Sequence, residues 1–274
     1  MPAIAGYAQE RIMSSLEQQP VKRDWTLVVI GSVLVFSAYT FLVVLPMARS
    51  VKAEIHDAGY PNTMYDLRLR MASEDSARFI DEYMPALQAC GTRRELLKKS
   101  IEAVTVADGL YCEFVVATGG TINYIASLIP QKPIHGFDSF EGLPENWREG
   151  MPKGTFARMD LPRVRPNVVL HKGWFDQVLP GWKGRFSGPL AFVHMDADLY
   201  SSTKTVLEGL ADRMVPGTII QFDEFFLYPG WKLNGEYKAF TEFRDAYHVQ
   251  FEYLGYSTES GQVALKIKSV SPAK

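Results

Sequence analysis

The chain has 274 residues, of which 47% are hydrophobic and 22% are charged. This composition is typical of a globular protein with a sizeable core and one or two domains. The formal net charge of −2 gives no general attraction to nucleic acid or anionic lipid, so no nucleic-acid partner is expected. Cys90 and Cys112 lie in apolar surroundings without metal-ligand spacing, which indicates buried free thiols and argues against a disulfide-built secreted domain.

An apolar segment without charged residues runs from Trp25 to Ala48, after an N-terminal extension over residues 1–24. A bilayer core about 30 Å thick needs about 20 apolar residues in a helix, so this segment is long enough to cross a membrane once. Trp25 suits the membrane–water interface. A cleaved signal peptide, whose apolar region is about 7–15 residues long, and a buried core helix are the alternatives.

Basic residues flank the apolar segment on both sides, so the positive-inside rule does not set its orientation. These residues are Arg11, Lys22 and Arg23 before it, and Arg49 and Lys52 after it.

The remaining elements alternate between helices and strands. Residues 49–75 are expected to form a polar connector with a turn at residues 59–62. Helices are predicted at residues 76–90, 92–105, 122–128, 203–214 and 236–247. Strands are predicted at residues 110–117, 133–137, 167–171, 190–195, 218–222, 251–256 and 262–267. This order predicts an α/β fold, a Rossmann-like parallel sheet covered on both faces and ending in an antiparallel hairpin.

Ligands of open α/β sheets bind beyond the carboxyl ends of the strands, so the residues that follow each strand are candidates for a site. After the first strand, Gly119 and Gly120 allow a tight turn and a close approach to a ligand, although an ordinary strand-to-helix turn uses the same residues. Asp138 ends the second strand, where it can accept hydrogen bonds from ribose hydroxyls or cap a turn. Trp174 follows the third strand and can cover a base or pack in the core.

Acidic residues follow both the fourth and the fifth predicted strand: Asp196 and Asp198 after one, Asp223 and Glu224 after the other. Carboxylates at close range repel one another, and a hard divalent cation such as Mg²⁺ would resolve the conflict. Helix capping is the alternative, but it would explain only one of these four acids, Asp198. The cluster therefore favours a metal or catalytic role.

Seven short strings of the sequence carry a family resemblance. They are residues 63–64, 68–69, 113–120, 138–145, 172–175, 196–200 and 223–224. These strings resemble the macrocin O-methyltransferase family, a group of bacterial class I sugar methyltransferases. The resemblance covers residues 60–267 and none of the apolar segment. It implies a methyltransferase domain over residues 76–270, with residues 49–75 as a connector or lid.

The resemblance implies a site for S-adenosylmethionine. Glu113 and Gly119 would belong to the motif that holds its amino-acid end, and Asp138 would bind the ribose. The implied cofactor-binding residues are Thr63 and Met64, in a segment that closes over the cofactor, Glu113, Gly119, Gly120 and Asp138, and Ser139 and Trp174 near the adenosine.

The resemblance also implies a metal-assisted methyl transfer. Asp196, Asp223 and Glu224 would hold Mg²⁺, and Asp198 would take the proton from a sugar hydroxyl as the general base.

The sequence departs from the family pattern at two positions. Val115 stands where the family has Gly, at a position where a positive φ would strain a β-branched residue, and Glu224 stands where many members have Asp.

The expected activity is therefore S-adenosylmethionine-dependent, Mg²⁺-assisted O-methylation of a sugar or another polyhydroxylated molecule. Because that cofactor is made in the cytoplasm, a single-pass membrane protein with a cytoplasmic catalytic domain is expected, with a lipid-linked or membrane-proximal acceptor. Val115 favours the alternative of a membrane-tethered, non-catalytic binding module. An NAD-dependent oxidoreductase would require a Gly-x-Gly-x-x-Gly turn, which the sequence lacks. Homo-oligomerisation stays open.

Overall fold

The computed structural model describes residues 25–49 and 63–271, in two compact units that divide between Tyr60 and Pro61. The extension over residues 1–24, the basic residues Lys22, Arg23 and Lys52, and the turn predicted at residues 59–62 lie outside the described residues. Each unit is described by itself.

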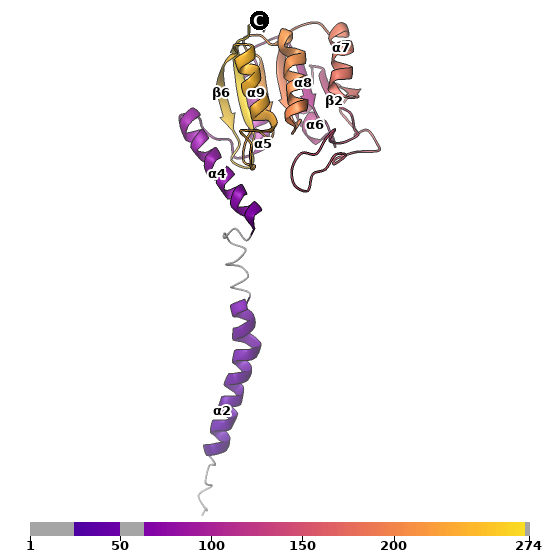
Figure 1. The fold of residues 1–274 in the computed structure, drawn as a ribbon. Coiled ribbons are helices and arrows are strands. Elements are labelled where there is room, and N and C mark those ends of the chain that lie inside the picture. The colour runs from indigo at the N-terminus through magenta and orange to yellow at the C-terminus, as the bar shows by residue number, and fades with distance from the viewer. Residues whose placement is uncertain (1–24, 50–62, 272–274) are drawn as a thin grey trace, which may run out of the picture. The chain divides into compact units, whose positions relative to one another are not determined.

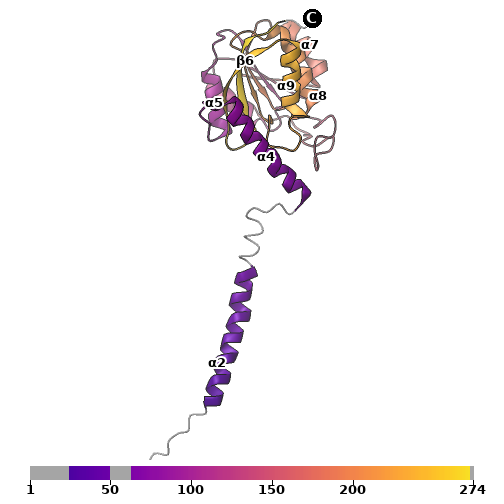
Figure 2. The ribbon, with the colours of Figure 1, turned by 60° about the vertical axis from the view of Figure 1, so that its left-hand side comes forward.

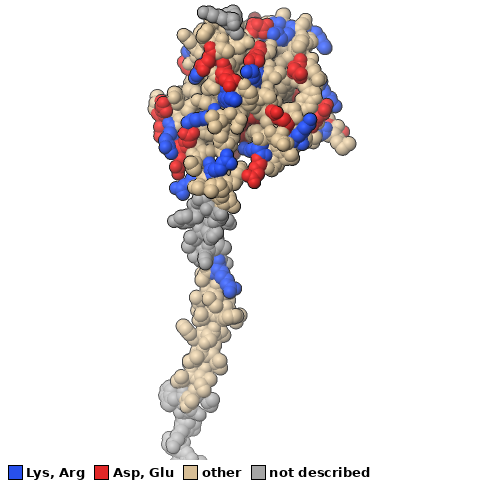
Figure 3. All heavy atoms as spheres, in the orientation of Figure 1, with Lys and Arg blue, Asp and Glu red and all other residues tan. Residues whose placement is uncertain are grey.

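The N-terminal unit contains one long helix. Helix α2 (Trp25–Tyr39) continues through a π-helical segment, η2 (Thr40–Val44), and helical residues extend to Arg49. By length and composition, the helical stretch Val29–Arg49 can cross a membrane, and none of it is buried in the protein. Figure 3 shows no charged side chain along this helix until its end. A signal sequence has the same properties, so the membrane anchor and the signal peptide both stay predictions. The third alternative, a buried core helix, does not fit a helix of which nothing is buried.

The C-terminal unit begins with a helix that was not expected at this position. Helix α4 (Met64–Tyr83) starts at a capping box in which Thr63 and Asp66 satisfy each other's backbone amides. The polar connector predicted up to residue 75 is therefore wrong from Met64 onward, because the polar residues there form the exposed face of an amphipathic helix. The helix ends at Tyr83, before Pro85, and not at residue 90.

The sheet confirms the predicted architecture. Its seven strands have the order β3-β2-β1-β4-β5-β7-β6, in which β1 to β5 are parallel and β7 is antiparallel to both β5 and β6. The strands are β1 (Leu110–Phe114), β2 (Ile134–Asp138), β3 (Val168–Lys172), β4 (Leu190–Met195), β5 (Ile219–Phe222), β6 (Gln250–Tyr256) and β7 (Val263–Ser269). This is the predicted Rossmann-like sheet with its terminal antiparallel hairpin.

Helices cover both faces of the sheet (Figures 1 and 2). Apolar residues of α5 (Arg93–Glu102) and α6 (Gly120–Leu128) pack in one core cluster with one face of the strands. A second and larger cluster takes apolar residues from α4, α7 (Phe175–Arg185), α8 (Tyr200–Leu210) and α9 (Gly235–Ala246). A short 3-10 turn, η3 (Ala211–Arg213), extends α8. Helix α7 was not predicted because Pro180, Gly181 and Gly184 interrupt its pattern. Both cysteines are buried and free, as expected.

The strand order places a crevice at the carboxyl ends of β1 and β4. From β1 the chain continues to β2 on one side, and β4 lies on the other side. At such a switch point the loops after the two strands turn away from each other and leave room for a ligand.

Candidate active site

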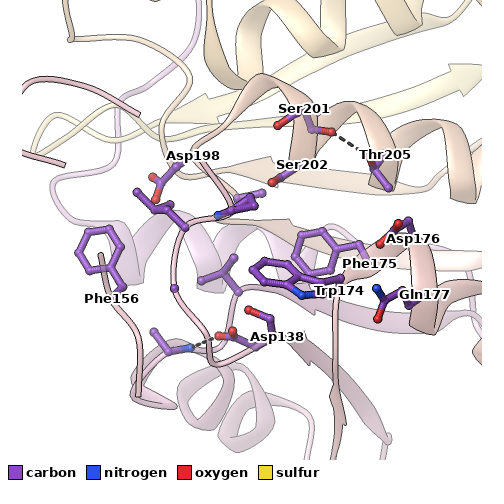
Figure 4. A pocket seen from close by; sticks show the side chains of 17 residues that line it. Asp138, Phe156, Trp174, Phe175, Asp176, Gln177, Asp198, Ser201, Ser202 and Thr205 are labelled. Carbon is purple, nitrogen blue, oxygen red and sulfur yellow. Dashed lines mark hydrogen bonds between the residues drawn. The ribbon is translucent and has the colours of Figure 1, made fainter. Parts of the chain in front are cut away.

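A cavity of about 370 Å³ opens at the carboxyl ends of the strands. Its wall brings together Asp138 from the end of β2, Trp174 from the start of α7 and Asp198 from the loop after β4 (Figure 4). The lining residues are Val115, Ala117, Asp138, Ser139, Gly142, Leu143, Pro144, Phe156, Trp174, Phe175, Asp176, Gln177, Ala197, Asp198, Ser201, Ser202 and Thr205.

Asp138 anchors the loop that follows β1. Its Oδ2 accepts hydrogen bonds from the backbone amides of Val116 (3.0 Å) and Ala117 (2.8 Å), and its Oδ1 accepts one from Phe140 (2.7 Å). The turn-capping role considered for Asp138 is therefore realised. A carboxylate has about four lone-pair positions, so one remains for a ligand hydroxyl beside this role.

The loop after β1 contains left-handed backbone at residues that disfavour it. Val115 has a φ of 70° and Ala117 a φ of 46°, whereas Gly119, with a φ of 81°, precedes α6 without strain. Val115 lines the cavity, whereas Gly119 and Gly120 are not among the lining residues. The strain predicted for a β-branched residue at position 115 is therefore present.

A buried polar row runs across the centre of the sheet under α5. Glu113, His194 and Gln221 are neighbours in register on β1, β4 and β5, and all three are fully buried. His194 Nδ1 lies 3.4 Å from Glu113 Oε2, and its Nε2 lies 3.6 Å from Asp223 Oδ1. Burial alone would lower the pKa of His194, but the nearby carboxylates of Asp223 and Glu113 raise this pKa to about 10. Glu113 therefore belongs to this row and not to the wall of the cavity.

Arg93 bridges two of the acids at the strand ends. Its Nη2 lies 3.1 Å from Asp196 Oδ2 and 2.9 Å from Asp223 Oδ1. Backbone hydrogen bonds from Asp196 to Phe114 and from Asp223 to Met195 extend the ladders past β4 and β5, which fixes both acids beside the neighbouring strand. The predicted convergence of acidic groups is thus present, with a guanidinium between two of them.

This arrangement does not fit the predicted Mg²⁺ site. Among the described residues, no group of three or more His, Cys, Asp or Glu side chains is placed to hold a metal ion. Asp196 and Asp223 are paired with Arg93. Burial, more than the nearby charges, raises the pKa of Glu224 to about 6.

Asp198 is the acid of this group that faces the cavity (Figure 4). It has a φ of 57°, a left-handed conformation that Asp tolerates better than most residues. Burial, followed by the charges of Glu224 and Asp223, raises the pKa of Asp198 to about 8. Such a carboxyl group is well suited to exchange a proton near neutral pH.

Glu236, on the first turn of α9, ties together the two acidic loops. Its fully buried carboxylate accepts hydrogen bonds from the backbone amide of Ala197 (3.1 Å) and from that of Glu224 (2.9 Å). The positions of Asp198 and Glu224 thus depend on a residue that sequence reasoning did not identify. An acidic residue in the first turn of a helix is too common to have indicated this role.

The other predicted cofactor residues divide into two groups. Ser139 and Trp174 line the cavity. Thr63 caps α4, and Met64 is 72% exposed, so neither forms part of the wall and their predicted closing role stays a prediction. Phe156, from the long loop between β2 and β3, lines the cavity and was not predicted, because the loop has no periodic pattern that marks it.

Comparisons with known proteins confirm the resemblance found in the sequence. The family model described as macrocin-O-methyltransferase matches residues 148–253. The 8-demethyl-8-(2,3-dimethoxy-alpha-L-rhamnosyl)-tetracenomycin-C 4'-O-methyltransferase of Streptomyces olivaceus is 31% identical over 158 residues, which cover 48% of this chain and 60% of that protein.

Two solved structures match this chain at 20% identity and a TM-score of 0.49. They are the calicheamicin methyltransferase CalS11, with 77% of this chain and 95% of that chain covered, and the O-methyltransferase NovP, with 65% and 80% covered.

Proposed function

We propose, on the resemblance to the macrocin O-methyltransferase family and on the cavity at the strand ends, that this chain is an S-adenosylmethionine-dependent O-methyltransferase. Its acceptor is a hydroxyl group of a sugar or of another polyhydroxylated molecule. The observation that carries the proposal is the presence of Asp138, Trp174 and Asp198, from three separate strand ends, in one cavity. These residues supply a ribose acceptor, an aromatic surface and a proton acceptor.

The cavity suits a nucleoside cofactor in size and chemistry. Its volume of about 370 Å³ lies within the range of about 300–1,000 Å³ of small-molecule sites. Asp138 retains acceptor capacity for ribose hydroxyls, and the indole of Trp174 provides a flat apolar surface for an adenine. When bound, S-adenosylmethionine supplies an electrophilic methyl group on a sulfonium.

Asp198 acts on the acceptor. Its carboxylate accepts the hydroxyl proton while the acceptor oxygen attacks, so a full alkoxide does not have to form. Glu236 fixes the loop of Asp198 through the amide of Ala197. Phe156 and Trp174 line the cavity with apolar rings, which limits water around the reacting oxygen. Much of the acceleration then comes from holding the oxygen close to the methyl group.

The proposed acceptor is a sugar hydroxyl. The relative from Streptomyces olivaceus is named as a 4'-O-methyltransferase of a rhamnosyl-bearing tetracenomycin, which supports this proposal. The apolar helix at Val29–Arg49 supports a membrane-proximal or lipid-linked acceptor. It also supports a single-pass topology. The C-terminal unit is proposed to face the cytoplasm because the methyl donor is made there.

A non-catalytic binding module is the second candidate, because Val115 holds a left-handed φ of 70° in the cavity wall. Calorimetry with S-adenosylmethionine, followed by incubation of the full chain with labelled donor and a membrane glycolipid extract, separates the two. Donor binding with a labelled, mass-identified product supports the enzyme. Donor binding without any labelled product contradicts methylation of the acceptors in that extract, and absence of donor binding contradicts the enzyme and supports the module, in which Val115 crowds the donor site.

A further inference from the structure

The acids at the ends of β4 and β5 already have a cation. Arg93 opens α5, where the hydroxyl of Thr92 caps the helix by accepting a hydrogen bond from the amide of Glu95. From this fixed position, Nη2 of Arg93 contacts Asp196 at 3.1 Å and Asp223 at 2.9 Å. One side chain thus joins the two loops that follow neighbouring strands.

Oδ1 of Asp223 has little capacity left for a metal. Besides Arg93, Gln262 Nε2 donates to Asp223 Oδ1 over 3.0 Å, and His194 Nε2 lies 3.6 Å from the same oxygen. Mg²⁺ requires ligand oxygens at about 2.0–2.1 Å in nearly octahedral geometry. Three donor groups already surround Oδ1 of Asp223, so this oxygen cannot approach Mg²⁺ to about 2.0–2.1 Å without displacing them.

The guanidinium also opposes a second cation through its charge. At a few ångströms, two positive charges in a partly buried site repel by several kcal/mol, even at an effective dielectric constant of about 20. Arginine keeps its charge at every physiological pH, so this opposition does not depend on conditions. A divalent ion would have to expel Arg93 before binding Asp196 and Asp223.

We propose that Arg93 takes the place of a divalent cation in this chain, as a positioning residue that holds the loops of Asp196 and Asp223 together. The site therefore does not require a metal. Through Asp196, two residues before Asp198, the guanidinium orders the loop that carries the general base. This last step rests on the proposed function, whereas the absence of metal binding does not.

The test is a Mn²⁺ titration of the full chain in detergent, followed by electron paramagnetic resonance. Wild-type protein is expected to leave added Mn²⁺ free. Arg93→Gln removes the charge and retains a polar side chain, so it should gain one bound Mn²⁺ equivalent, and that equivalent should be lost again in Arg93→Gln/Asp223→Asn. Arg94→Gln is the matched control, since Arg94 lies over the ring of Tyr124 and makes neither acid contact. It should behave like wild type.

Two outcomes overturn the proposal. One is wild-type protein that binds one Mn²⁺ equivalent and loses it on Asp223→Asn. The other is a folded Arg93→Gln protein that gains none. The wild-type titration remains decisive if Arg93→Gln does not fold. Because the readout is metal binding, a chain that binds no S-adenosylmethionine would contradict the proposed function and leave this result intact.

Discussion

The hydroxyl of Ser201 donates a hydrogen bond of 2.6 Å to Oε1 of Glu145. Ser201 lines the cavity on the first turn of α8, and Glu145 follows Pro144, which lines it from the long loop between β2 and β3. This bond joins the loop to a helix across the cavity. Because both residues are exposed, the bond is expected to order the loop without adding much to the stability of the fold.

Ser201→Ala should raise the KM for the methyl acceptor and leave kcat almost unchanged. A net hydrogen bond contributes about 0.5–1.5 kcal/mol, so an increase of about threefold is expected. Steady-state kinetics measures the effect, and Ser201→Thr, which keeps a hydroxyl, should restore the wild-type KM. A lower kcat with an unchanged KM would show that Ser201 acts on the chemical step instead.

Asp198→Asn should keep cofactor binding and lose turnover. The amide retains the shape of the side chain but cannot accept the hydroxyl proton, and general-base catalysis contributes about 10²–10⁴-fold. Calorimetry with S-adenosylmethionine and turnover with labelled donor measure the two effects separately.

Asp108→Asn is the matched control for this change. Asp108 lies before β1 with a fully exposed side chain, 3.7 Å from Lys132. It should bind the donor and turn over like wild type. Retention of full turnover by Asp198→Asn would reject Asp198 as the base.

Val115→Gly should bind S-adenosylmethionine more tightly than wild type. The change removes a side chain from the cavity wall and relieves a left-handed conformation that costs about 1–2 kcal/mol in a non-glycine residue. Relief of strain also offsets the lost burial, so the free energy of unfolding should change by less than about 1 kcal/mol.

Val116→Gly provides the comparison. Val116 is 3% exposed and is not among the residues with a positive φ, so its replacement should destabilise the fold by about 2 kcal/mol or more. Calorimetry and urea unfolding measure both variants. Weaker donor binding by Val115→Gly would mean that the valine itself contacts the ligand favourably.

The central strands were predictable because β1, β2, β4 and β5 are almost fully buried, largely apolar runs that follow a Gly or a Pro. The predicted strand at residues 190–195 has the bounds of β4. Helices with mixed patterns were less predictable. Met64–Tyr83 has enough charged residues to resemble a connector, and α7 contains Pro180. In both cases, packing of one helix face on the sheet outweighs the local signal.

In the candidate site, only residues that directly follow a strand could be predicted from the sequence. Asp138 and Asp198 reach one cavity because parallel strands end at a common edge. The cation that meets Asp196 and Asp223 was predicted as a metal and is an arginine in the structure. Arg93 is distant in sequence, and nothing in a helix start reveals that its side chain crosses to two strand ends. Glu236 was missed for the same reason.

Acidification should destabilise the fold through His135. Its Nδ1 lies 3.0 Å from Nε2 of His171, and both rings pack against Phe186. Burial, with a smaller contribution from His171, lowers the pKa of His135 to about 4 from 6.5. The unfolded chain therefore binds more protons between these values, so stability is lost as the pH falls from about 6.5 to about 4.

This loss should be at most about 3 kcal/mol for His135. Urea unfolding across that pH range measures it. His135→Phe keeps an aromatic ring beside Trp182 and Phe186 and has no titrating group, so its free energy of unfolding should depend less steeply on pH. Equal slopes for the variant and the wild type would contradict the assignment.

The apolar helix at Val29–Arg49 should hold the full chain in a membrane. Carbonate extraction should leave wild-type protein in the membrane fraction. Leu34→Arg places a charge near the centre of the helix, at a cost of about 2.5–3.5 kcal/mol for insertion, and should shift protein to the supernatant. Met159→Arg, at a fully exposed position of the C-terminal unit, is the control and should stay with the membrane.

The orientation of the helix follows from the source of the methyl donor. If the C-terminal unit faces the cytoplasm, protease added to inside-out vesicles should digest it, and protease added to right-side-out vesicles should not. Protection in inside-out vesicles would place the unit away from its proposed cofactor. Sequencing of the mature N-terminus completes the test, because a chain that begins after residue 48 would identify the apolar segment as a cleaved signal.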